Sequence, residues 1–310
     1  MIPKMPPRGG QTGFLYAPPY RIQGISVAGE QTMVQVPELD VAFDIGMCPR
    51  IALASKYVAL SHGHMDHVGG LPYYFSQRMF QRMGVGTCIC HTQVAAAVQS
   101  MMAAWIDLES QRTQHSIVPI EPDEQIEIKN NLFIKAIEVS HTVPALGFVI
   151  IERRSKLREE FRDLPQDRLR EIKARGESIT RTLEIPLVAY TGDTELGPFL
   201  FRDEFTKARV VISECTFFDD EHRARAKVGK HLHILDIAAL MDAWTAPTVI
   251  LTHLSRRTNL ATARAVLEEA LGDHTPRAHF LMDHRVNRQR YEAQLAEAQA
   301  LSGHASEESS

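Results

Sequence analysis

Four side chains that bind divalent metals well stand within six positions, directly after the apolar run 57–60: His62, His64, Asp66 and His67. The first two point to the same side of an extended chain, because strand side chains alternate between faces. The carboxylate and the third imidazole follow where we expect the chain to turn into a helix. Neutral imidazole and carboxylate oxygen are preferred ligands of zinc and similar ions. The spacing therefore predicts a metal site rather than a polar loop that happens to contain histidines.

Three further potential ligands stand at the ends of predicted strands: His141, Asp193 and His253. Each follows a short run of β-branched and apolar residues, which is typical of a buried strand. Ligand sites of layered α/β folds commonly lie where the ends of several strands converge. A lone histidine at a strand end is usually structural. Three such residues, added to the first cluster, favour a binuclear metal centre.

The order of the predicted elements is that of an α/β protein. Apolar runs predict strands at 41–45, 57–60, 132–139, 187–190, 210–213 and 248–251. Helical patterns begin near positions 66, 92, 233 and 259. The potential ligands extend from position 62 to position 253 without a break in composition, which favours a single domain over 20–301. We expect residues 1–19 and 302–310 to be disordered, since they are rich in Pro and Gly or in polar residues.

Composition excludes several classes of protein. With 310 residues, of which 44% are hydrophobic, the chain can bury a substantial core. No apolar stretch approaches the roughly 20 residues of a membrane span, and the N-terminus lacks the apolar segment of a secretory signal. We therefore expect a cytoplasmic enzyme with reduced cysteines, no membrane and no nucleotide cofactor. Cys88 and Cys90 are a weak candidate for a second metal site, and two core residues of a strand are the preferred interpretation.

The order His-x-His-x-Asp-His, then His, Asp and His resembles that of the metallo-β-lactamase superfamily. Within it the chain resembles ribonuclease Z, the transfer-RNA 3′-processing endonucleases, and most of all their short plant form. The supporting segments are 39–46, 60–72, 140–147, 190–194, 213–217 and 250–255. The block Ser213-Glu-Cys-Thr-Phe217, followed by His231, favours the nuclease branch. The resemblance covers about residues 20–281 and implies a four-layer αββα sandwich.

The chain also departs from the bacterial members of this family. It has neither their opening Phe-Leu-Gly-Thr-Gly strand nor their Pro-x-Lys-x-Arg-Asn loop, which is associated with RNA recognition. Their Gly-His-Ser-Thr segment appears here as Gly229-Lys-His-Leu-His233. Counting back from Asp236 places His231 at the catalytic position, with His233 as the alternative.

The resemblance implies two Zn²⁺ ions, with Mn²⁺ or Fe²⁺ as alternatives. One ion would be held by His62, His64 and His141, and the other by Asp66, His67 and His253, with Asp193 bridging the two. Asp66 would also accept a proton from the attacking water. His231, oriented by Glu214, would protonate the leaving ribose 3′-oxygen. The alternative is that Glu214 only hydrogen-bonds and orients a histidine that binds metal. Since members of the family are usually homodimers, a second copy of the chain is an expected partner.

Residues 152–186 interrupt the predicted strands with ten basic and eight acidic side chains between positions 152 and 184. In related ribonucleases this interval forms an arm that grips transfer RNA, whereas a solvated, salt-bridged hairpin is the alternative. The net charge of the chain is −4, so any attraction for RNA must come from a local patch.

Three functions fit these observations. The first is an endoribonuclease that removes the 3′ trailer of precursor transfer RNA. The second is a small-molecule phosphodiesterase or another hydrolase of the same superfamily, which the nearly neutral arm and the missing recognition loop favour. The third is a metal-bearing scaffold or an RNA-binding module without turnover, which the complete set of ligands argues against.

Overall fold

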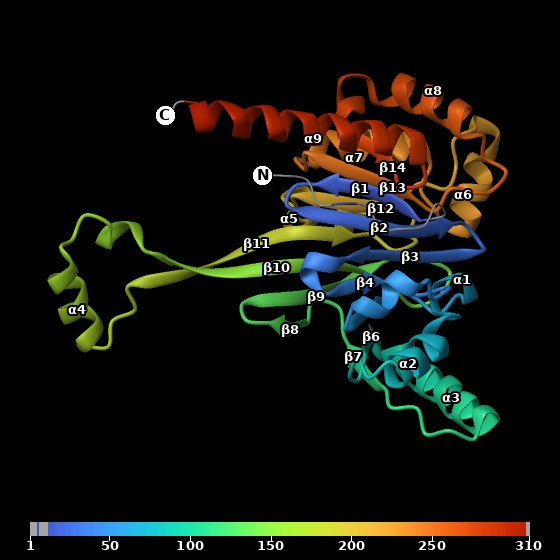
Figure 1. The fold of residues 1–310 in the computed structure, drawn as a ribbon, viewed down its shortest axis with the longest axis horizontal. Helices are drawn as coiled ribbons and strands as arrows, with labels where there is room; N and C mark the ends of the chain where they lie inside the picture. Colours follow the sequence, from blue (N-terminus) through green and yellow to red (C-terminus); the bar gives the residue numbers. More distant parts are fainter. Residues whose placement is uncertain (1–4, 6–11, 308–310) are drawn as a thin grey trace.

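Two seven-stranded sheets form the centre of the molecule (Figure 1). The computed structural model describes residue 5 and residues 12–307. In the first sheet the strand order follows the chain: β1 (Gly13–Ala17), β2 (Tyr20–Val27), β3 (Gln31–Val36), β4 (Val41–Phe43), β5 (Tyr57–Leu60), β6 (Thr87–His91) and β7 (Ser116–Ile120). The second sheet also runs in chain order: β8 (Gln125–Lys129), β9 (Leu132–Val139), β10 (Ala145–Leu157), β11 (Thr180–Tyr190), β12 (Val210–Glu214), β13 (Thr248–Thr252) and β14 (Ala278–Phe280).

Each sheet is half antiparallel and half parallel. Strands β1 to β4 and β8 to β11 are antiparallel neighbours, whereas β4 to β7 and β11 to β14 run parallel. The parallel strands alternate with helices, as crossover connections require. The helices are α1 (Met65–Val68), α2 (Leu71–Phe80), α3 (Thr92–Glu109), α4 (Gln166–Ala174), α5 (Asp203–Thr206), α6 (Arg223–Gly229), α7 (Ile234–Ala243), α8 (Leu260–Leu271) and α9 (His284–Glu307).

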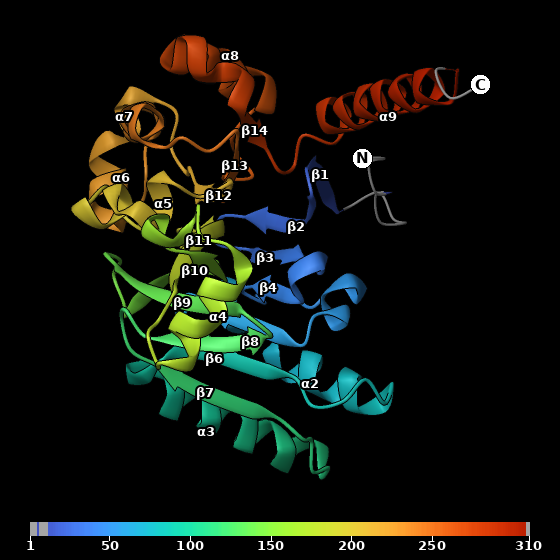
Figure 2. The ribbon, with the colours of Figure 1, turned by 90° about the vertical axis from the view of Figure 1, so that its left-hand side faces the viewer.

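Three apolar clusters define four layers. The central one fills the space between the sheets and includes the stacked rings of Phe43 and Tyr190, whose centroids are 4.9 Å apart. A second joins the outer face of the second sheet to α7 and α8, and a third joins the first sheet to α2 and α3. Figure 2 shows these two helix pairs on opposite sides of the strands. The predicted αββα sandwich is confirmed.

Both ends of the predicted domain need correction. Disorder was the expectation for residues 1–19, but Gly13–Ala17 form β1, which pairs with β2. Phe14 of this strand packs edge to face against Tyr291 of α9, and this contact holds the strand in place. Disorder was also expected from residue 302, but α9 continues to Glu307. Residues 1–4, 6–11 and 308–310 lie outside the described part of the chain.

The predicted arm is a long extension of β10 and β11. The two strands pair as far as Leu157 and Thr180, well beyond the sheet, and α4 lies at the tip (Figure 1). Most side chains of the tip are exposed, and Ile172 is the buried exception on α4. The arm therefore contributes little to the core of the domain.

Candidate metal centre

The potential ligands identified from the sequence come together at one edge of the two sheets. His62 and His64 follow the end of β5, and Asp66 and His67 lie in α1 directly after them. The remaining three, His141, Asp193 and His253, follow the ends of β9, β11 and β13. The convergence follows from topology, because the parallel strands end at the same edge. The structure thus unites residues that are as many as 191 positions apart in the sequence.

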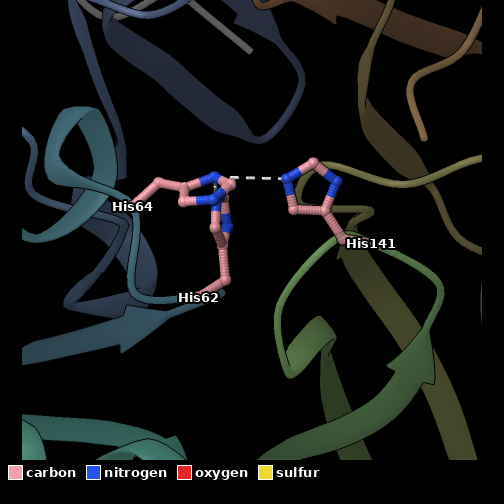
Figure 3. Close-up of side chains that lie close together, drawn as sticks. All are labelled: His62, His64 and His141. Atoms are coloured by element: carbon pink, nitrogen blue, oxygen red, sulfur yellow. Dashed lines mark hydrogen bonds between the residues drawn. The ribbon is translucent and has the colours of Figure 1, made fainter. Parts of the chain in front are cut away.

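The first group consists of His62, His64 and His141, whose ligand nitrogens lie within 4.8 Å of one another (Figure 3). Nε2 of His62 is 3.0 Å from Nδ1 of His64, and Nε2 of His141 is 3.3 Å from the same atom. Three imidazole nitrogens directed at one point form a set of donors suited to a divalent ion. This group therefore fits a metal without any rearrangement of the backbone.

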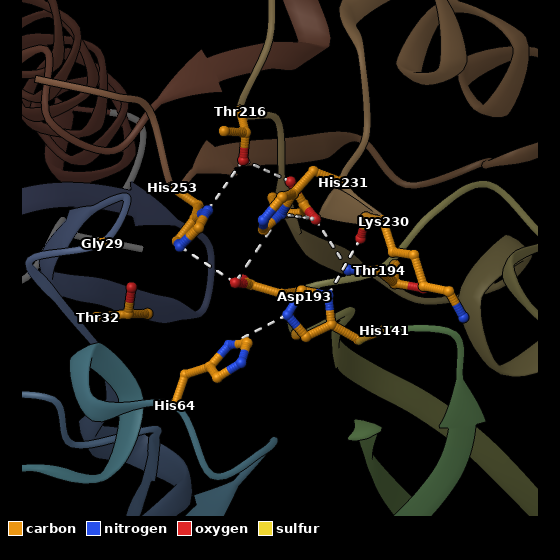
Figure 4. Close-up of polar contacts among 12 residues, drawn as sticks. Gly29, Thr32, His64, His141, Asp193, Thr194, Thr216, Lys230, His231 and His253 are labelled. Carbon is orange, nitrogen blue, oxygen red and sulfur yellow. Dashed lines mark hydrogen bonds and ion pairs between the residues drawn. The ribbon is translucent and has the colours of Figure 1, made fainter. Parts of the chain in front are cut away.

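The second group consists of Asp66, His67 and His253, again within 4.8 Å of one another. Nε2 of His67 and Nε2 of His253 are buried and lack a hydrogen-bond partner. They lie 3.3 and 3.2 Å from Oδ2 of Asp193, which is also 3.9 Å from Nε2 of His62. Buried nitrogens without partners are rare in native proteins, and a bound cation would satisfy both. Asp193 thus lies between the two groups (Figure 4).

The charges within this cluster support one another. Burial opposes ionisation of Asp193, but His253 and His67 outweigh it and hold the pKa of this carboxyl well below its usual range. Burial also works against the cationic form of His67, yet Asp193 and Asp44 raise the pKa of this imidazole. For His62, burial and the neighbouring His67 lower the pKa. Asp193 is accordingly ionised and His62 neutral, the forms that bind metals, whereas a metal on His67 would have to displace the proton that the two carboxylates favour.

Asp44 contacts the candidate centre, and the sequence reasoning did not identify it. Its carboxylate is fully buried and accepts hydrogen bonds from Nδ1 of His67 at 2.8 Å and from the hydroxyl of Tyr190 at 2.5 Å. The backbone and the hydroxyl of Ser61 donate to it as well, at 2.7 and 2.8 Å. Binding Nδ1 leaves Nε2 of His67 directed into the cluster. The segment 39–46 supported the resemblance, but only the contact with His67 reveals a role for Asp44.

Other candidate ligands are oriented in the same way. Nδ1 of His253 lies 2.9 Å from the hydroxyl of Thr216, and Nδ1 of His141 lies 3.2 Å from the carbonyl of Lys230. The backbone N–H of Gly29 donates to Oδ2 of Asp66 at 2.9 Å. The two histidine contacts fix each ring by the nitrogen that faces away from the centre. Oδ2 of Asp66 faces the centre instead, since it also lies 3.6 and 3.5 Å from Nε2 of His67 and of His253.

Gly46 permits the close approach of two backbones beside the centre. A Cβ at this position would stand 1.7 Å from the carbonyl oxygen of Asp66, so no other residue fits without a shift of α1. The neighbouring N–H of Ile45 donates to the carbonyl of His67 at 2.7 Å. The segment after β4 therefore determines where α1 presents its two ligands.

His231 and Glu214 form a pair at the side of the cluster. Nδ1 of His231 is 2.9 Å from Oε1 of Glu214, a buried carboxylate that also accepts from the N–H of Thr194 and the hydroxyl of Thr216. Burial lowers the pKa of His231, but Glu214 outweighs it and raises this pKa to about 9. The ring lies 5.1 Å from that of His141 between centroids (Figure 4). A cationic imidazole beside these candidate ligands can deliver a proton to a leaving group.

His233, the alternative to His231, lies in a different environment. It is buried at the N-cap of α7, where Nδ1 accepts from the N–H of Leu235. Its own N–H donates to Asp236 at 2.9 Å, completing a capping box. This contact network gives His233 a structural explanation and favours His231 as the proton donor.

Comparison with known proteins agrees with this architecture. The family described as beta-lactamase superfamily domain matches residues 49–254. The chain is 33% identical to tRNase Z TRZ1 of Arabidopsis thaliana over 245 residues, which cover 77% of this chain and 86% of that protein. It is 32% identical to the chloroplastic tRNase Z TRZ2 of the same plant, over 80% of this chain and 72% of the relative.

Two solved structures have the same fold at low sequence identity. The metallo-β-lactamase fold protein YhfI from Bacillus subtilis has a TM-score of 0.56 at 16% identity, over 87% of this chain and 95% of that one. The short form of human tRNase Z has a TM-score of 0.54 at 16% identity, over 88% and 96% of the two chains. The fold and the matched family define the class as that of the β-lactamase superfamily. Within this class, the chain belongs to the tRNase Z family, as its motifs predicted.

Asp44→Asn should lower the affinity for a divalent metal, measured with zinc as the probe, by about 10- to 100-fold, because His67 loses the charged partner that orients it. The measurement is metal retention against a competing chelator. Tyr190→Phe is the matched control, since it removes one donor from the same carboxylate but leaves its contact with His67 intact. Equal zinc retention by Asp44→Asn and the wild type would contradict the assigned role.

Proposed function

We propose that this protein is an endoribonuclease that removes the 3′ trailer of precursor transfer RNA and leaves a 3′-hydroxyl. The observation that carries the proposal is the contact between His231 and Glu214 beside the cluster of candidate ligands. Glu214 belongs to the block 213–217, which favours the nuclease branch of the superfamily. The 33% identity to a protein named tRNase Z, over 86% of its length, supports the same substrate.

The residues of the proposed centre would hold two Zn²⁺ ions. His62, His64 and His141 would hold one and Asp66, His67 and His253 the other, and Asp193 lies close to both groups. Zinc bound there would supply a hydroxide near neutral pH and neutralise charge on the phosphate. Imidazole and carboxylate also suit Mn²⁺ and Fe²⁺, so metal analysis of the purified protein decides between the three.

The residues around the centre handle the protons. Asp66, held by the N–H of Gly29, accepts the proton of the attacking water. Nδ1 of His231 donates to Glu214, so Nε2 holds the proton for the ribose 3′-oxygen as the P–O bond breaks. Since Glu214 is buried and bound by Thr194 and Thr216, it holds the imidazole in a single orientation.

Replacing His231 by alanine should slow cleavage of a trailer-bearing precursor by about a hundredfold or more, because the leaving oxygen loses its acid. The zinc content should stay at the wild-type level. The assay maps both product ends, with and without chelator. As a control, His233→Asn keeps a good N-cap residue on α7 and should change the rate by no more than about threefold. A wild-type protein that binds zinc but leaves every precursor intact would refute the proposed function.

The second candidate function is hydrolysis of small phosphodiesters, and the charge pairing within the arm favours it. Seven of the ten basic side chains there lie within 4 Å of a carboxylate: Arg153, Arg154, Arg158, Arg162, Arg168, Arg170 and Arg181. Exposed ion pairs of this kind are worth about 0–1 kcal/mol, so an RNA phosphate can replace the carboxylate. Lys156, Lys173 and Arg175 pair with no carboxylate among the residues described here. The weak pairs and these three cations leave positive charge for RNA phosphates, so we propose that the arm contacts transfer RNA despite its internal pairing.

Replacing residues 158–179 by an Asn-Gly turn between Leu157 and Thr180 tests the arm. We expect kcat/KM for the precursor to fall by at least about tenfold, since the loss of each phosphate contact weakens binding. Turnover of bis(p-nitrophenyl) phosphate and the melting temperature should stay unchanged, because the tip lies outside the core. Equal activity of both proteins on the precursor would favour the small-molecule function.

We also propose that the protein is a homodimer, on the basis of α2 and α3. Only Val98 and Met102 of α3 are buried, although the helix is largely apolar. Trp105 and Leu108 are 41% and 76% exposed, and Phe80 of the neighbouring α2 is 67% exposed. An apolar surface of this kind on a monomer marks an interaction site. A second copy of the same surface would bury it symmetrically.

Leu108→Glu should convert the dimer to a monomer, because it replaces the most exposed of these apolar side chains by a charge. Sedimentation at micromolar concentration measures the change. Leu301→Glu, on the 67% exposed Leu301 of α9, is the control and should remain dimeric. A wild-type protein that sediments as a monomer would disprove this part of the proposal.

Because the substrate is an intracellular RNA, we expect the protein to act in the cytoplasm.

A further inference from the structure

A cavity of about 310 Å³ opens beside the proposed proton donor. His231 forms part of its wall, and α6, the start of α7 and the loop after β11 complete it. The cavity is distinct from the metal ligands themselves, since none of them lines it. Its volume is at the lower end of the range for small-molecule sites and suits one nucleotide rather than several.

Two cationic side chains in the wall of this cavity can contact a bound anion. Arg223 and Lys227 stand four residues apart on α6, so their side chains project from the same face of the helix. Lys227 has no ion-pair partner among the described residues. Arg223 pairs at 3.1 Å only with Asp220, which is 84% exposed to solvent. Such an exposed pair is weak, so a phosphate can displace the carboxylate.

The two acidic side chains that also line the cavity are already bound. Glu195 accepts from the hydroxyl of Ser140 at 2.5 Å and lies 3.6 Å from Lys230. The carboxylate of Asp236 accepts from the backbone of His233 at the start of α7. Each carboxylate has a donor of its own within the protein, and Lys230 partly offsets the charge of Glu195, so the two cations of α6 remain available to an anion.

Two leucines give the cavity an apolar part. Leu196 and Leu235 line it and are 39% and 40% exposed, which is unusual for large aliphatic side chains. Pockets for organic ligands combine such apolar walls with a few charged groups. A nucleobase has apolar faces, and its nucleotide carries a phosphate, so the lining matches both parts of one nucleotide.

We propose that this cavity binds the last nucleotide of the RNA that is retained after cleavage, and this rests on the proposed function. The 3′-oxygen of that nucleotide accepts the proton of His231, so its ribose must lie against this imidazole. Its base then enters the cavity between Leu196 and Leu235. The phosphate on its 5′ side reaches Lys227 and Arg223, which position the substrate without taking part in the chemistry.

The groove on the other side of the centre does not offer the same chemistry. It has a volume of about 590 Å³ and is lined by Glu138, His141, Arg202 and Lys230, among others. The guanidinium of Arg202 is already bound by Asp123 and Glu204. Lys230 lies 3.1 Å from the hydroxyl of Ser140 and 3.6 Å from Glu195. The described residues of this groove therefore lack a counterpart to Lys227, which has no ion-pair partner, and Arg223, which has only an exposed one.

The test uses the full chain loaded with zinc. Lys227→Ala and Arg223→Ala should each lower kcat/KM for a trailer-bearing precursor by about tenfold, mainly by raising KM. Each should also reduce the slope of log KM against log salt concentration by about one, because one fewer counterion is released on binding. Turnover of bis(p-nitrophenyl) phosphate and zinc content should not change. The matched control is Arg225→Ala, because Arg225 is an exposed cation of α6 that does not line the cavity. Lys227→Arg should restore binding.

A precursor whose last retained nucleotide lacks its base tests the apolar part. With the normal precursor, Leu235→Ala should raise KM about threefold or more, whereas with the abasic precursor the same substitution should have no effect. Equal effects on both precursors would overturn the placement of the base.

The outcomes separate the two proposals. If the wild type cuts the precursor but Lys227→Ala and Arg223→Ala behave like Arg225→Ala, the cavity proposal fails and the proposed function stands. If Arg225→Ala weakens binding equally, general attraction between charges explains the effect, and the cavity proposal fails as well. If the wild-type protein does not cut the precursor, both the cavity proposal and the proposed function are refuted.

Discussion

One buried carboxylate, that of Asp44, connects the fold to the candidate metal centre. It accepts hydrogen bonds from Ser61 at the end of β5, from His67 in α1 and from Tyr190 at the end of β11. These donors come from both sheets, so a single side chain holds the two layers in register at the edge where the ligands converge. An isolated buried charge would be strongly destabilising, and the four hydrogen bonds make it tolerable. A metal on Nε2 of His67 would strengthen the same network.

Backbone strain gathers at the same edge of the sheets. Asp44, Lys230 and His253 have φ values of 58°, 52° and 61°, in the left-handed region that residues with a Cβ seldom adopt. Each such residue costs about 1 kcal/mol or more and persists only where neighbouring contacts require it. Here the strain directs a carboxylate, a carbonyl and an imidazole at the ligand cluster. The packed sheets provide the stability that maintains these conformations.

The protein is acidic as a whole but has cations at the two places where we propose that RNA binds. The chain is acidic as a whole, and the paired cations of the arm neutralise most of its charge locally. Cations that are free or weakly paired remain beside His231 and on the arm. An acidic body with local basic sites disfavours unspecific binding along RNA, because the net field repels a polyanion. Binding of the precursor then requires that its phosphates contact the cations beside His231 and those on the arm at the same time.

The sequence by itself determined the candidate ligands and the family, because both reside in short local signals. His62, His64, Asp66 and His67 are neighbours in the chain, and the other candidate ligands follow recognisable strands. Only the tertiary structure decided which partner each side chain meets. Asp44 contacts Tyr190 across 146 positions, and the choice between His231 and His233 depends on where Glu214 lies. Such contacts arise when two sheets pack face to face, and no periodicity within a single strand encodes the strand that will lie opposite.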